Sequence, residues 1–106
     1  MEKIYYDSYE QRIRTTVWAE KNLEGNAEIH KYVRGVYIDD IFGMDEDETK
    51  LIISAESFPS LFSSAGVSSL KDLFEFWSKE NSVRSGYEQI KAWIDKTGIK
   101  YEEETI

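Results

Sequence analysis

The sequence predicts an α+β fold, in which helices cover one face of an antiparallel sheet of about three to five strands. Apolar residues recur with a period of two in the N-terminal half and with helical spacing after residue 56. A run of strands followed by a run of helices is typical of this arrangement. The length of 106 residues suits one hydrophobic core, so we expect a single domain over residues 1–106.

The strands are predicted from alternation of apolar and polar residues. Residues 12–20 alternate, residues 22–26 supply turn formers, and residues 27–38 are again rich in Ile, Val and Tyr, which predicts a hairpin. Residues 3–9 predict a shorter first strand because aromatic and β-branched residues favour a pleated surface. Residues 49–56 alternate once more and predict a further strand. The acidic residues before it are therefore expected to form a loop between strands.

The first of about three helices is predicted over residues 58–65. Its apolar residues fall at i, i+3, i+4 and i+7, so they line one stripe of a helix. Pro59 suits the first turn, where its missing N–H has no partner to lose, and Gly66 suits the left-handed position after the last turn.

Two further helices are predicted from serines that are each followed three residues later by an acid. Ser69 begins a helix that runs to about residue 80, and Ser85 begins one that ends at Gly98. Residues 99–101 are expected to form a short strand or an extended tail. Residues 102–106 are expected to fray.

Charge is distributed unevenly along the chain. The 13 Lys and Arg against 21 Asp and Glu give a net charge of −8, and residues 37–106 hold the whole excess. Within it, ten residues contain six acids and no base: Asp39, Asp40, Asp45, Glu46, Asp47 and Glu48. A field of this sign repels nucleic acid and anionic membranes, so neither is an expected partner, and it attracts basic macromolecules.

The residues that catalysis needs are scarce. The chain has one histidine, His30, no cysteine and no glycine-rich phosphate loop, so we expect no catalytic residue and no enzyme activity. His30 is predicted to be a residue of the sheet surface. Asp45, Asp47 and Glu56 have the spacing of an EF-hand loop, but Lys50 stands where that loop needs Gly. No metal or cofactor is therefore expected.

Two tryptophans lead to different predictions. Trp77 lies on the apolar stripe of its helix and is predicted to fill the core. Trp18 shares the charged side of its strand with Arg14 and Thr16, so it either packs under a helix or marks a second contact surface. The absence of cysteine fits a reducing compartment, and the first residues are unlike a secretory leader, so a cytoplasmic protein is expected.

The acidic segment has two open interpretations. It is either a solvated turn that keeps the protein soluble, or a protrusion that enters a cationic cleft with an aromatic anchor. The second interpretation gives the candidate partner-binding residues: Asp39, Asp40, Phe42, Asp45, Glu46, Asp47 and Glu48.

In size, acidity, lack of cysteine and α+β pattern, the chain resembles the immunity proteins of bacterial polymorphic toxins, including those of contact-dependent growth inhibition systems. The resemblance implies a protein that binds and neutralises a cognate toxin, often a nuclease with a basic site, by occluding its active site. It carries over no binding residue. A phage-encoded nucleic-acid mimic, such as an anti-CRISPR protein, fits the same composition. A small carboxylate-based enzyme or ligand-binding domain around His30 is a third alternative.

Overall fold

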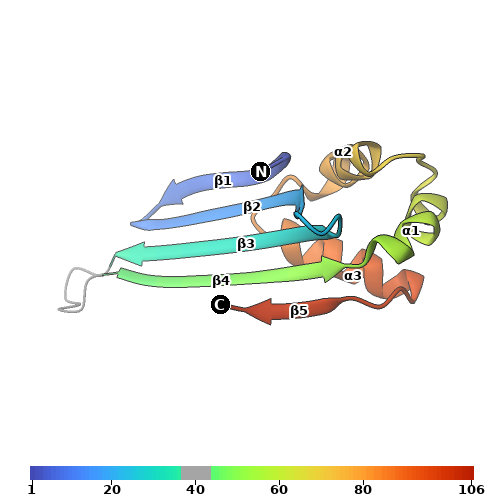
Figure 1. Cartoon of the computed structure of the whole chain (residues 1–106). Coiled ribbons are helices and arrows are strands. Elements are labelled where there is room, and N and C mark those ends of the chain that lie inside the picture. The colour runs from blue at the N-terminus through green and yellow to red at the C-terminus, as the bar shows by residue number, and fades with distance from the viewer. Residues whose placement is uncertain (37–43) are drawn as a thin grey trace.

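The computed structural model describes residues 1–36 and 44–106 and confirms the α+β prediction (Figure 1). Five strands form one antiparallel sheet in the order β1-β2-β3-β4-β5. Their bounds are β1 Lys3–Glu10, β2 Ile13–Lys21, β3 Ala27–Val36, β4 Met44–Ile53 and β5 Glu102–Thr105. The first four strands follow one another along the chain, and the C-terminal strand β5 pairs with β4.

The helices lie between β4 and β5 in sequence and pack on one face of the sheet (Figure 1). Their bounds are η1 Ala55–Ser57, α1 Phe58–Ala65, α2 Leu70–Asn81 and α3 Gly86–Thr97. The predicted cap of α2 is confirmed, because the Ser69 hydroxyl accepts a hydrogen bond from the backbone N–H of Asp72 at 3.1 Å. Ser85 is the N-cap residue of α3, as predicted, but its side chain makes no capping hydrogen bond.

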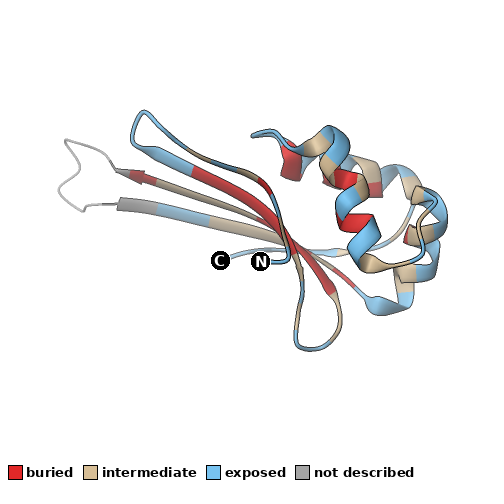
Figure 2. Cartoon of the chain, turned by 90° about the horizontal axis from the view of Figure 1, so that it is seen from above, coloured by how far each residue is buried: buried red, intermediate tan, exposed pale blue. Residues whose placement is uncertain are grey.

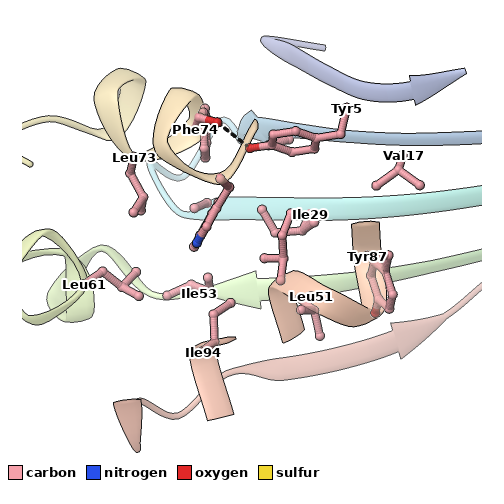
Figure 3. Close-up of a cluster of buried hydrophobic side chains, with 14 residues drawn as sticks. Tyr5, Val17, Ile29, Leu51, Ile53, Leu61, Leu73, Phe74, Tyr87 and Ile94 are labelled. Carbon is pink, nitrogen blue, oxygen red and sulfur yellow. Dashed lines mark hydrogen bonds between the residues drawn. The ribbon is translucent and has the colours of Figure 1, made fainter. Parts of the chain in front are cut away.

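The hydrophobic core lies between the sheet and the helices (Figure 3). Alternate strand residues point toward the helices, as the period of two predicts. The fully buried members of this core with the largest side chains are Val17, Ile29, Leu51, Ile53, Leu61, Leu73, Trp77, Ile90 and Ile94. At the edge of the core, the buried Tyr5 hydroxyl donates a hydrogen bond to the backbone carbonyl of Phe74 at 3.0 Å.

Two predicted boundaries are corrected by the structure. β4 begins at Met44 and not at residue 49, so the second half of the acidic segment is strand and not loop. Continuous pairing with β3, from Met44 opposite Val36 to Ile53 opposite Ala27, outweighs the low strand propensity of acids. Residues 102–105, expected to fray, form β5 because the edge of β4 is available for pairing.

The sheet is longer than the helical layer. Figure 2 shows the helices over one end of the sheet, while the other end projects beyond them. The molecule accordingly measures 49 Å along its longest axis and 25 and 24 Å along the others. We call the projecting end the arm, and define it as residues 8–15 (the turn between β1 and β2 with the adjoining strand ends), 32–35 of β3 and 44–48 of β4.

The turn at the tip of the arm has an unusual backbone. Glu10 pairs with Ile13, so the turn has two central residues, Gln11 and Arg12, with φ angles of 52° and 69°. Such a turn matches strand twist, but positive φ at two positions favours Asn-Gly and costs other residues about 1–2 kcal/mol each.

Replacing this turn with Gln11→Asn and Arg12→Gly should therefore raise the free energy of unfolding by about 1–2 kcal/mol, because Asn and Gly tolerate positive φ. Urea denaturation would measure this difference in the free energy of unfolding, provided that the two proteins have equal m-values. The matched control, Gln11→Val with Arg12→Val, should lower stability, since β-branched residues oppose this backbone. Equal stability of both variants would contradict the interpretation that Gln11 and Arg12 strain the backbone of this turn.

Candidate functional site

The sheet face turned away from the helices is acidic. The alternation of side chains along each strand, together with the pairing of β1 to β5, shows which residues lie on this face, which we call the uncovered face. Among described residues, the acids of this face are Asp7, Glu20, Glu28, Glu46, Glu48, Glu102 and Glu104, and the bases are Arg14, Arg34 and Lys50. Asp7 accepts two hydrogen bonds from Arg14, at 3.1 and 3.0 Å, and these hold the pKa of its carboxyl below the usual range.

The predicted partner-binding residues do not form one loop. Asp39, Asp40 and Phe42 lie outside the described residues. The other four lie in β4 within the arm: Asp45, Glu46, Asp47 and Glu48. Because side chains alternate along a strand, Glu46 and Glu48 lie on the uncovered face and Asp47 lies on the face that carries the helices.

A groove separates the arm from the beginning of α3. It has a volume of about 310 Å³ and is lined by residues of β2, β3, β4 and α3. Its apolar part consists of Ile13, Val33, Gly35 and Tyr87, and its acids are Glu46, Asp47 and Glu88. Lys31 also lines it and forms an ion pair with Glu88. The groove therefore combines an apolar floor with the carboxylates of Asp47 and Glu88 at its rim, since the side chain of Glu46 lies on the uncovered face and pairs there with Arg34.

The outer edge of β4 is paired over only part of its length. β5 pairs with residues 49–52, and the backbone N–H of Ile106 donates to the carbonyl of Glu48 at 2.8 Å. No strand in the described ranges pairs with this edge of β4 over residues 44–47. The arm thus presents open backbone groups beside the acidic rim of the groove.

His30 lies on the uncovered face of the sheet but is only 6% exposed, so the prediction of a residue at the sheet surface is wrong. Its Nε2 atom is 2.8 Å from Glu28 Oε1 and 3.1 Å from Glu20 Oε1. Its Nδ1 atom is 3.3 Å from Glu48 Oε1. Three carboxylates from three strands therefore surround one imidazole; we call His30, Glu20, Glu28 and Glu48 the histidine cluster.

Trp18 explains why His30 is buried on a face that no helix covers. The two rings stack with centroids 4.6 Å apart and planes 6° from parallel. Trp18 is itself only 8% exposed, and its indole N–H donates to Glu20 Oε1 at 3.0 Å. It therefore neither packs under a helix nor forms an exposed contact surface, so neither interpretation of Trp18 is confirmed.

Further polar groups orient Glu28. Its Oε2 atom accepts a hydrogen bond from Asn22 Nδ2 at 2.9 Å and lies 3.6 Å from Lys50 Nζ. Burial raises the pKa of Glu28, but the hydrogen bonds from Asn22 and His30 and the charge of Lys50 outweigh it, so the pKa lies below its usual range. Glu28 is therefore a carboxylate at neutral pH.

The histidine cluster was missed by the sequence analysis, although the sequence contained a signal for it. Trp18 with Glu20, and Glu28 with His30, are each two residues apart, so each pair shares one face of its strand. The five-residue turn between the strands sets a register that places Trp18 opposite His30 and Glu20 opposite Glu28. Counting outward from that turn would have brought the four side chains together.

None of the helices in the described part of the chain is long and apolar enough to cross a membrane. The candidate functional features of the described residues are the groove, the open edge of β4 and the histidine cluster. Comparisons of the chain with protein-family models, with curated proteins and with solved structures each found no match.

Proposed function

We propose that the chain is an immunity-type inhibitor, which neutralises a basic protein partner by inserting its arm into a cationic cleft of that partner. The observation that carries this proposal is the groove beneath the arm, with its apolar floor and carboxylate rim. It lies at the end of the molecule that projects beyond the helices (Figure 2).

The groove suits a long basic side chain. The methylene stem of Lys or Arg packs on apolar residues while its charged end stays at the polar rim. Here Ile13 and Val33 offer the apolar surface, and Asp47, whose side chain lies on the same face of the sheet, offers a carboxylate close to it. A charge-assisted hydrogen bond between an arginine of the partner and such a carboxylate is stronger than a neutral one.

The shape and the charge of the chain support occlusion as the mechanism. A narrow sheet end enters a cleft more easily than a rounded domain does, and it blocks an active site without any chemistry of its own (Figure 1). The net charge of −8 increases the rate of encounter with a basic partner. Affinity then depends on the desolvated contacts within the groove.

The test compares two variants that remove the same charge. Glu46→Gln with Asp47→Asn changes two acids at the rim of the groove, whereas Glu56→Gln with Glu80→Gln changes two exposed acids of η1 and α2 that do not line it. A partner is first captured from the native host with the unaltered chain, and is then purified for binding kinetics. We expect the rim variant to bind about tenfold more slowly and with weaker salt dependence, because charge steering and rim contacts are lost.

The control variant should retain most of the association rate, and both variants should unfold like the unaltered chain. Equal losses in both variants would mean that only net charge matters, which contradicts the groove as the contact site. Ile13→Ala supplies a second readout, because Ile13 is 39% exposed and its loss should raise the dissociation rate with little effect on folding. A desolvated anchor typically contributes about 2 kcal/mol to binding.

A further inference from the structure

We propose that the histidine cluster is a binding site for a divalent transition-metal cation, with Zn²⁺ as its probe. The ligands are His30 through Nε2, and Glu20 and Glu28 through one carboxylate oxygen each. These three ligand atoms all lie within 4.8 Å of one another. This site lies apart from the groove, and its occupation does not depend on a protein partner.

The spacing of the ligand atoms fits a coordination shell. Around Zn²⁺, which binds N and O ligands at about 2.0–2.2 Å, neighbouring ligand atoms are about 2.8–3.6 Å apart. The Nε2 atom of His30 lies 2.8 Å from Glu28 Oε1 and 3.1 Å from Glu20 Oε1. A cation can therefore bind between these atoms with small side-chain movements.

The surrounding groups orient the ligands as the outer shell of a metal site does. Histidines that bind metals commonly donate their other ring N–H to a carboxylate, which fixes the tautomer. Glu48 Oε1 occupies that place, 3.3 Å from Nδ1 of His30. Trp18 donates to Glu20 at 3.0 Å, and Asn22 donates to Glu28 at 2.9 Å, so both carboxylates are held in position.

The charges around His30 also favour a dication. Four carboxylates, those of the histidine cluster and of Glu104, face two positive groups, Lys50 Nζ and the amino group of Met1. The carboxylates therefore outnumber the positive groups by two near His30 and Glu28, whose side chains are only 7% and 11% exposed. A bound dication balances this excess.

The ligand types select the class of metal. Mg²⁺ and Ca²⁺ prefer shells made entirely of oxygen, whereas imidazole is a good ligand for Zn²⁺ and the other late first-row cations. One imidazole with two carboxylates therefore predicts that Zn²⁺ binds more tightly than Mg²⁺.

The experiment titrates the full chain with ZnCl₂, and in parallel with MgCl₂, in a buffer that does not chelate metals. Calorimetry should show one Zn²⁺ per chain, and nuclear magnetic resonance should show a shift of the His30 ring nitrogens. Glu20→Gln should weaken Zn²⁺ binding about tenfold or more, because a charged ligand is lost while Gln still accepts from Trp18. Glu80→Gln, an equal charge change at an exposed site on α2, should leave the affinity unchanged.

A lack of Zn²⁺ binding at millimolar concentration would overturn the proposal and leave the histidine cluster as a proton-bridged network. Binding that does not shift the His30 resonances, or that persists in Glu20→Gln, would likewise overturn it by placing the ion on other carboxylates. His30→Gln serves as a second variant, with far-ultraviolet circular dichroism to confirm its fold. Since this titration needs no partner, its failure leaves the proposed inhibitor function untouched.

Discussion

Replacing Trp77 by Ala should lower the free energy of unfolding by about 3–5 kcal/mol, because a large buried ring is lost and a cavity is left. Trp77 has no exposed surface, which confirms its predicted place in the core. Its ring lies 6.3 Å from that of Phe74 and 5.7 Å from that of Trp93. Urea denaturation followed by circular dichroism would measure the loss.

Trp77→Phe is the matched control. The indole N–H of Trp77 is buried and has no hydrogen-bond partner among the described residues. Phe keeps an aromatic ring against its neighbours and removes this unpaired donor, so it should cost less than half as much as Ala. Equal costs for Ala and Phe, or a loss below 1 kcal/mol for Ala, would contradict the packing of Trp77.

The parts of the fold that depend on local patterns could be predicted from the sequence. The turn at residues 22–26, between β2 and β3, joins an alternating run to a run rich in Ile, Val and Tyr, and the structure confirms that hairpin. The left-handed Gly66, with φ of 71°, ends α1 as predicted. These features are set by residues close in sequence, where propensity and hydrogen bonding point to the same answer.

The parts that depend on pairing between strands could not be predicted from the sequence alone. Residues 44–48 are dominated by acids, which are poor strand formers, yet they lie opposite residues 32–36 of β3. Their pairing is a continuation of the β3–β4 ladder from the core into the arm. The acidic strand β5 likewise depends on distant residues. Glu103 of β5 accepts hydrogen bonds from Lys91 and Tyr87 of α3 at 2.9 and 2.7 Å.

The candidate sites follow the same division. The acidity of the arm was evident from composition, but its groove requires Tyr87 and Glu88 of α3 to lie beside β3 and β4. The burial of His30 requires the stacked Trp18 on the neighbouring strand. Long-range packing thus decides both the groove and the histidine cluster, although each uses residue types that the sequence displays openly.

The position of α3, and with it the groove, depends on Gly86, the first residue of that helix. A Cβ at this position would lie 2.2 Å from the backbone oxygen of Asn81, at the C-terminal end of α2. The backbone N–H of Gly86 also donates to the carbonyl of Val83 at 2.9 Å, which fixes the tight connection between the two helices. Only glycine lets the backbones of α2 and α3 approach this closely.

Gly86→Ala should therefore lower the free energy of unfolding by about 3 kcal/mol, at the upper end of the cost of overpacking, because backbone atoms must move apart. Gly98→Ala is the control: Gly98 has a φ of 77° and no atom within 4 Å of the added Cβ, so its cost should be only about 1 kcal/mol. The shift of α3 should also move the resonances of Tyr87 and of the groove in Gly86→Ala and not in Gly98→Ala. Equal stability losses in the two variants, or unmoved groove resonances in Gly86→Ala, would show that the contact with Asn81 does not set the position of α3.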